Sequence, residues 1–156
     1  MLEICTLHRI KVYFMKHLSI AADQAQDTNW SHSRRRSLAG DSKPRVLLVD
    51  DEPSILRGIK RILSKDWNVE IAVGASTAAS MLTSTQYDAI VTDYDMPGRD
   101  GLWLLDYVRT RFPKMRRILL SGSEPFIFSN HMKSGLIQHY IPKPATTNSL
   151  FASLEF

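Results

Sequence analysis

The chain has 156 residues, enough for one domain with a sizeable hydrophobic core and little left over for a second. Its formal net charge of +4 is uneven: residues 1–44 hold seven Lys/Arg against four Asp/Glu, whereas residues 45–156 hold thirteen against twelve. A basic tail on a nearly neutral domain is a weak signal for nucleic acid, so we expect no direct nucleic-acid binding. Cys5 is the only cysteine, which excludes an internal disulfide framework and suits a reducing cytoplasm.

Residues 1–43 are predicted to be a disordered or weakly helical basic extension. Residues 24–43 are polar, contain the run Arg34–Arg36 and have too few apolar side chains to pack. Earlier, Ile10, Phe14 and Leu18 recur at near-helical spacing with basic residues between them, which leaves open a membrane-surface or partner-binding helix as well as an unstructured leader. No apolar run approaches the roughly 20 residues that cross a bilayer, so no transmembrane segment is expected.

From residue 44 onward, short apolar runs alternate with segments whose apolar residues recur at helical spacing. This alternation predicts strands at 45–49, 69–73, 87–92, 117–120 and 138–141, and helices at 54–65, 77–85, 101–112, 124–133 and 147–154. In the first helix, Ile55, Ile59, Ile62 and Leu63 are expected to face the core. Alternating strands and helices require a parallel sheet that is covered on both faces. We therefore predict an α/β fold for residues 44–156: a doubly wound, five-stranded parallel sheet with helices on both faces.

Polar and charged side chains follow four of the predicted strands. They are Asp50 and Asp51 after the first strand, Asp93 and Asp95 after the third, Ser121 after the fourth and Lys143 after the fifth. Each has an ordinary structural explanation, because acids before a helix often cap it and aspartates are frequent in turns. In a parallel sheet, however, ligands bind outside the carboxyl ends of the strands. The sequence therefore predicts that these side chains converge on one functional site.

The predicted cluster suits the chemistry of phosphoryl transfer. Neighbouring carboxylates repel one another unless a cation is present, and oxygen ligands with retained waters are typical of Mg²⁺. A carboxylate in such a site is a plausible nucleophile toward phosphorus. An ammonium and a hydroxyl would stabilise the charge that develops on the transferred group.

Four stretches of the chain resemble the receiver domains of two-component response regulators. They are Val46–Leu56, Asp88–Leu102, Leu119–Gly122 and Tyr140–Pro144, and they occur in family order across about residues 44–156. The resemblance implies a flavodoxin-like receiver fold. It also implies a phosphoprotein that receives its phosphoryl group from a histidine kinase or a histidine phosphotransfer protein and then acts in signal transduction.

The resemblance also implies a role for each site residue. Asp93 would be the phosphoacceptor, with Lys143 and Ser121 assisting the transfer, and Ser121 and Tyr140 would form the switch. Mg²⁺ would be held by Asp50, Asp51, Asp93 and the backbone carbonyl of Asp95. The Lys143–Pro144 peptide bond would be cis.

The chain departs from the family pattern in its later part. The segment 124–139 is shorter than in most receiver domains. It contains Phe126, Ile127 and Phe128, whose side chains we expect to pack in the core rather than to contact a partner. Twelve residues follow Pro144, so we expect a single-domain response regulator without an output domain. Its downstream partner is unknown, and a phosphorylation-dependent dimer is left open.

The prediction is therefore a phosphorylation-dependent signalling switch, not an enzyme apart from slow self-dephosphorylation. One alternative is a receiver-fold adaptor that works independently of phosphorylation. Another is a phosphatase of the haloacid-dehalogenase type, for which Asp93, Asp95, Ser121 and Lys143 supply superficially similar groups. That alternative is disfavoured because its nucleophile ends the first strand of the sheet, whereas Asp93 ends the third.

Overall fold

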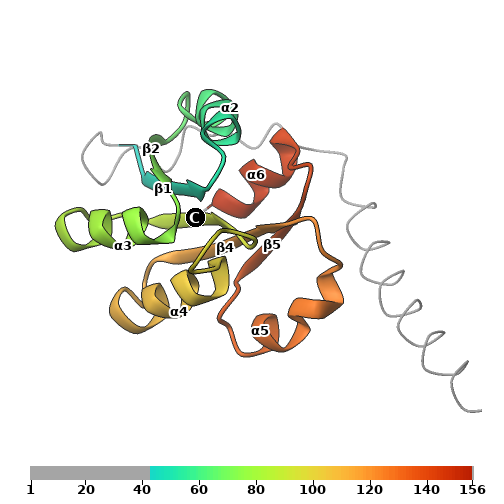
Figure 1. The fold of residues 1–156 in the computed structure, drawn as a ribbon. Helices are drawn as coiled ribbons and strands as arrows, with labels where there is room; N and C mark the ends of the chain where they lie inside the picture. Colours follow the sequence, from blue (N-terminus) through green and yellow to red (C-terminus); the bar gives the residue numbers. More distant parts are fainter. Residues whose placement is uncertain (1–42, 156) are drawn as a thin grey trace, which may run out of the picture. The chain divides into compact units, whose positions relative to one another are not determined.

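The computed structural model describes residues 43–155, which form a five-stranded parallel sheet in the order β2-β1-β3-β4-β5 (Figure 1). The strands are β1 (Arg45–Asp50), β2 (Asn68–Val73), β3 (Ala89–Asp93), β4 (Arg116–Ser121) and β5 (His139–Pro142). Every neighbouring pair is parallel. The predicted α/β fold is confirmed.

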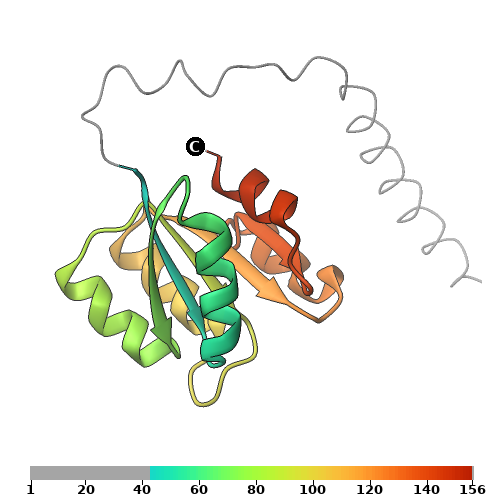
Figure 2. The same ribbon diagram turned by 90° about the horizontal axis from the view of Figure 1, so that it is seen from above.

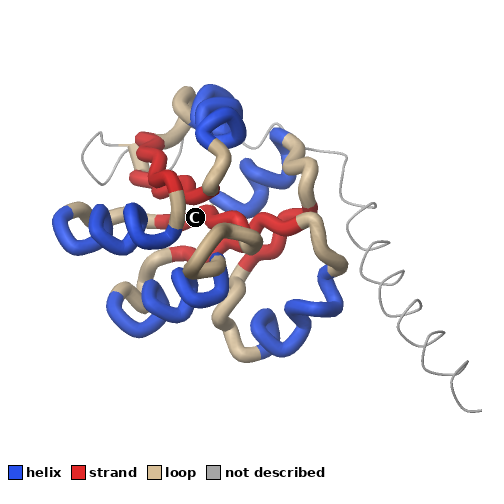
Figure 3. Tube along the Cα trace, in the orientation of Figure 1, coloured by secondary structure: helices blue, strands red, loops and turns tan. Residues whose placement is uncertain are grey.

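Helices cover both faces of this sheet, as Figure 3 shows. They are α2 (Pro53–Leu63), α3 (Ala75–Ser84), α4 (Gly101–Arg111), the 3₁₀ helix η1 (Pro125–Phe128), α5 (Ser129–Lys133) and α6 (Thr147–Leu154). One core cluster joins the sheet to α3, α4 and η1, and a second joins it to α2 and α6. Figure 2 views the molecule from the side on which α2 and α6 lie.

The three central strands of the sheet, β1, β3 and β4, are mainly apolar and have both faces covered. All five residues of β3 are buried, and only the first residue of β1 and of β4 is not. In α2 the buried residues are Leu56, Ile59 and Leu63. The prediction that Ile62 faces the core is wrong, since its side chain is 39% exposed. At about 100° per residue, Ile62 falls on the flank of the helix, while Leu56 completes the buried stripe.

The helix predicted at 124–133 is divided in two. Pro125 opens η1, and the five-residue α5 follows it directly. Phe128 is fully buried, whereas Phe126 is 72% and Ile127 52% exposed. Core packing was therefore the right expectation for Phe128 and the wrong one for the other two. A 3₁₀ turn has three residues, so when Phe128 points inward its two predecessors point elsewhere.

The remaining boundaries agree with the prediction to within one or two residues, and α6 has the predicted bounds. Helix α4 begins where the Asp100 carboxylate accepts a hydrogen bond from Trp103 N at 2.8 Å, and α6 begins with a Thr146/Ser149 capping box. Across residues 43–155, no helix has the length and apolar character that a membrane crossing requires.

Candidate functional site

Asp50 and Asp93 end two strands that lie side by side. Strands β1 and β3 are paired in parallel, with Val49 opposite Thr92, so the next residue of each strand reaches the same edge of the sheet. Asp50 is 2% and Asp93 4% exposed, and Asp51, one residue beyond β1, is half-buried. One carboxylate oxygen from each of Asp50, Asp51 and Asp93 lies within 4.8 Å of the others. The predicted convergence of these three carboxyl groups is present.

Lys143 joins the two buried aspartates. Its Nζ lies 2.9 Å from Asp93 Oδ1 and 3.1 Å from Asp50 Oδ2. Its backbone N donates to Ser121 O at 2.9 Å, and the peptide bond to Pro144 is cis, as the resemblance implied. The second oxygen of Asp50, Oδ1, accepts a hydrogen bond from Glu52 N at 2.8 Å. Asp50 is therefore held through both of its oxygens.

Burial and the neighbouring charges act in opposite directions on this site. Burial raises the pKa of Asp93 and outweighs the hydrogen bond and positive charge of Lys143, while the charge of Asp50 adds to the rise. For Lys143, burial alone would lower the pKa, but the hydrogen bonds and charges of Asp93 and Asp50 outweigh it and raise the pKa. Lys143 is therefore a cation at neutral pH.

The donor set suits a hard divalent cation. Three carboxyl groups face one ammonium, so the ionised cluster keeps a negative charge that a further cation would neutralise. The donors are all oxygens, the ligands that Mg²⁺ prefers. Asp95 is exposed and is not one of the carboxylates that converge in the described part of the chain. The prediction for Asp95 concerned its backbone carbonyl, and it stays a prediction.

Gly101 was not singled out in the sequence, yet it lies directly against the site. A Cβ atom at this position would be 2.2 Å from the backbone O of Asp93 and 3.1 Å from Leu119 Cδ1. The Gly101 amide also donates to Tyr94 O at 3.0 Å. Helix α4 can begin this close to the end of β3 only because residue 101 has no side chain. The available signal was a lone glycine at the start of a predicted helix.

Ser121 and Tyr140 are brought together beside the cluster. Ser121 is buried, and its Oγ accepts a hydrogen bond from Ser123 N at 3.0 Å. The Tyr140 hydroxyl donates to the carbonyls of Ser123 at 2.5 Å and Ser121 at 3.2 Å. Burial and the charge of Glu124 raise the pKa of Tyr140, so its hydroxyl remains a donor at neutral pH.

Three aromatic rings connect the neighbour of Asp93 to β5. Phe128 packs edge-on against Tyr94, with 5.0 Å between ring centroids, and lies 5.7 Å from the Tyr140 ring. Tyr140 was expected to belong to the switch, whereas no contact of its ring with Tyr94 or Phe128 was predicted. The row depends on the turn of η1, which the helical pattern did not predict.

The sequence matches known proteins over this same region. Residues 46–155 match the model of the response regulator receiver domain family. The chain is 32% identical over 120 residues to the uncharacterized transcriptional regulatory protein YesN of Bacillus subtilis, covering 71% of this chain and 31% of YesN. It is 33% identical over 106 residues to the hydrogenase transcriptional regulatory protein HoxA of Cupriavidus necator, covering 67% of this chain and 22% of HoxA. The chain thus spans a third or less of these two relatives.

Solved structures show the same fold. The signal receiver domain of an HD domain-containing protein from Pseudomonas fluorescens Pf-5 is 29% identical, with a TM-score of 0.66 over 72% of this chain and 91% of that one. A CheY-like response regulator receiver domain protein from Methanospirillum hungatei is 27% identical, with a TM-score of 0.67 over 72% of this chain and 91% of that one.

Proposed function

The chain belongs to the response regulator receiver domain family, and from that premise we propose that it is a phosphorylation-dependent signalling switch whose phosphoacceptor is Asp93. One observation carries the assignment: Asp93 is a buried carboxylate at the carboxyl edge of the sheet, with Lys143 Nζ 2.9 Å from its Oδ1 and two further aspartates beside it. Asp50 is a poorer nucleophile, since both of its oxygens already accept hydrogen bonds.

In the proposed reaction, a carboxylate oxygen of Asp93 attacks the phosphorus of a phosphohistidine on a partner kinase or phosphotransfer protein. The new O–P bond forms an acyl phosphate as the P–N bond breaks, and the departing imidazole takes a proton from solvent. Lys143 remains against the reacting group and offsets its negative charge. Bound Mg²⁺, held by Asp50, Asp51, Asp93 and the carbonyl of Asp95, would neutralise charge on the phosphoryl oxygens.

The switch is proposed to run through Ser121 and Tyr140. Ser121 Oγ accepts a hydrogen bond from Ser123 N, so its own O–H can be donated to the new phosphoryl group. Movement of Oγ toward that group would alter its contact with Ser123 N. The Tyr140 hydroxyl is bonded to the carbonyls of these same two residues, so the movement changes its partners as well. A bias of a few kcal/mol between two existing arrangements is enough for such a switch. The surface around η1, α5, β5 and α6 would then change its affinity for a downstream protein.

We also propose that the protein acts in the cytoplasm and, apart from slow hydrolysis of its own acyl phosphate, catalyses no reaction. Incubation with Mg²⁺ and acetyl phosphate, followed by intact-mass measurement, tests the assignment. We expect one phosphoryl adduct on the wild type, none on Asp93→Asn, and none when a chelator is present. An adduct that persists in Asp93→Asn would overturn the assignment of the acceptor.

A phosphorylation-independent adaptor is the second candidate. The observation in its favour is the short α5, beside which Phe126 and Ile127 are exposed in the region that would report phosphorylation. Failure to form an adduct, together with failure to bind Mg²⁺ by calorimetry, would replace the switch with the adaptor. If an adduct forms but the fluorescence and the amide spectrum of residues 121–142 do not change, the protein is phosphorylated without switching.

A further inference from the structure

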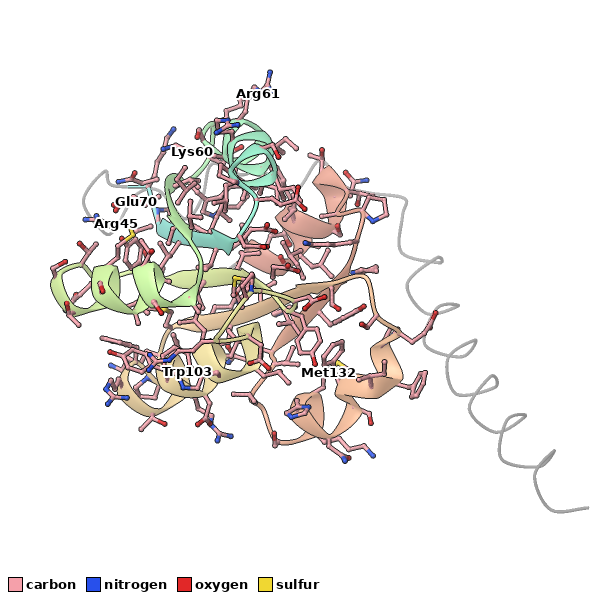
Figure 4. All side chains as sticks on the ribbon, viewed as in Figure 1. Arg45, Lys60, Arg61, Glu70, Trp103 and Met132 are labelled. Atoms are coloured by element: carbon pink, nitrogen blue, oxygen red, sulfur yellow. The ribbon has the colours of Figure 1, made fainter. Side chains whose placement is uncertain are left out.

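Helix α2 carries a row of basic side chains on its outward face. Arg57, Arg61 and Lys65 recur every four residues from the middle of the helix to just beyond its end, and all three are exposed. Residues four apart stack on the same face of a helix. This face is opposite the buried stripe of the helix, and Figure 4 shows Arg61 extending away from the sheet.

None of these three cations has an ion-pair partner within residues 43–155. The ion pairs of this region are formed by Arg45, Arg109 and Lys143 instead. Like charges four residues apart on a helix repel one another, so the row works against the stability of α2. Lys60 is different, because it lies on the side of α2 nearer β2 and its charge contributes to the lowered pKa of Glu70. The outward face of α2 is therefore a basic surface that no acidic side chain of the described region neutralises, and its charge is complementary to an external anion.

Lys43 adds a further positive charge at the same end of α2. Lys43 Nζ donates to the carbonyls of Ser64 at 3.1 Å and Lys65 at 2.6 Å, which fixes where the chain enters the domain.

The two ends of α2 lie in regions of opposite charge. The N-terminus of the helix follows Asp51 and Glu52 at the acidic edge that holds Asp93, whereas Arg61 and Lys65 lie at its other end. An anionic surface would attract the basic end and repel the acidic edge. The domain would therefore be oriented with its acidic site facing away from that surface and open to a phosphodonor.

We propose that the basic face of α2, formed by Arg57, Arg61 and Lys65, docks on an anionic lipid surface. Ile62 favours lipid over nucleic acid, because its 39% exposed side chain lies beside the row and can enter the interface between headgroups and acyl chains. Basic residues at an anionic membrane surface each strengthen binding by about 1 kcal/mol, which corresponds to about five-fold. The inference does not depend on the proposed phosphorylation.

The test is sedimentation of the full chain with vesicles of pure phosphatidylcholine and with vesicles that also contain phosphatidylserine. We expect binding only to the second kind, weakening as salt rises. The triple variant Arg57→Gln, Arg61→Gln, Lys65→Gln should bind at least ten-fold more weakly. The matched control Arg111→Gln, Lys114→Gln, Lys133→Gln removes the same charge from exposed positions on the other side of the sheet and should bind within about three-fold of the wild type.

Three results would overturn the proposal. These are no binding to phosphatidylserine vesicles, equal weakening in both triple variants, and tighter binding of the α2 face to a DNA duplex than to vesicles at the same salt concentration. The last result would assign the face to nucleic acid. Urea denaturation verifies that both variants are folded, and this control does not rely on the proposed phosphorylation.

Discussion

Lys143 Nζ lies 2.9 Å from Asp93 Oδ1, an ion pair that joins the residue after β5 to the last residue of β3. Strand β4 lies between those two strands in the sheet, so the ion pair crosses the carboxyl end of β4. The same ammonium also reaches Asp50 on β1. A single side chain thus links three of the five strands at the site where we propose that phosphorylation occurs.

Substitution of Lys143 tests this link directly. In Lys143→Gln the charge that faces the transferred group is lost, and we expect the rate of phosphorylation by acetyl phosphate to fall about 100-fold, as for removal of one stabilising donor from an active site. The pKa of Asp93 should rise further. The hydrogen bond and the positive charge of Lys143 lower this pKa and partly offset the rise that burial causes. Time-resolved intact mass measures the rate, and carboxyl NMR titration in chelator measures the pKa. A rate within two-fold of the wild type would remove Lys143 from the mechanism.

Gly101 should be intolerant of even a methyl group. A Cβ at this position would lie 2.2 Å from the backbone O of Asp93, so Gly101→Ala must move either α4 or the end of β3. We expect the free energy of unfolding to fall by about 1–3 kcal/mol and the phosphoryl adduct to be lost or slowed. Urea denaturation and intact mass provide the two measurements.

Gly58 is the matched control for this substitution. It lies in the middle of α2, where an added Cβ would meet nothing within 4 Å. Gly58→Ala should stabilise the protein by up to about 1 kcal/mol through its higher helix propensity. Equal effects of the two substitutions would show that the close approach of Gly101 to Asp93 is unimportant.

Arg117 should be essential for stability. Its side chain is buried and donates to the carbonyls of Pro113, Met115, Gly135 and Leu136, which ties the loop before β4 to the loop before β5. Arg117→Leu would leave these carbonyls without their donor and should lower the free energy of unfolding by about 2–4 kcal/mol. Arg109→Gln breaks only an exposed ion pair with Asp106 and should change it by no more than about 0.5 kcal/mol. Urea denaturation measures the free energy of unfolding of both variants. Similar decreases in the two would contradict the role given to Arg117.

The contact between Tyr87 and Glu70 should contribute stability that depends on pH. The Tyr87 hydroxyl donates to Glu70 Oε2 at 2.8 Å. This hydrogen bond is the main cause of the lowered pKa of Glu70, and burial together with Glu70 raises the pKa of Tyr87 to about 12. Because the pKa of Glu70 is lower in the folded state, the stabilisation is present above its ordinary value of 4.5 and is lost as the pH falls through the folded value.

Tyr87→Phe should therefore lower the free energy of unfolding by about 1 kcal/mol near pH 7 and by less near pH 3. Urea denaturation at the two pH values measures the difference. Tyr107→Phe is the control, since the Tyr107 hydroxyl makes no hydrogen bond in the part of the chain that the structure describes, and it should change little at either pH. A loss for Tyr87→Phe that is the same at both pH values would rule out Glu70 as the partner that matters.

Much of the site could be read from the order of the strands. Buried parallel strands are continuously apolar and end abruptly, so the residues that follow them, Asp50, Asp93 and Lys143, could be assigned to one edge without any knowledge of distances. The periodicity of the helices likewise predicted which segments cover the sheet. These properties are local, since they depend on residue type and spacing along a short stretch of chain.

The tertiary structure decided whatever depends on contacts between distant segments. Arg117 resembles an ordinary surface cation in the sequence, and it is buried only because two loops bring four carbonyls to its guanidinium. Gly101 resembles a simple helix start until the end of β3 is placed against it. Phe126 and Phe128 have the same local character, but residues two apart point to different sides of a helical turn, and only Phe128 packs into the core formed with the sheet and α4. In each case the deciding atoms belong to another element of the fold, and the spacing of residues along the chain does not encode those contacts.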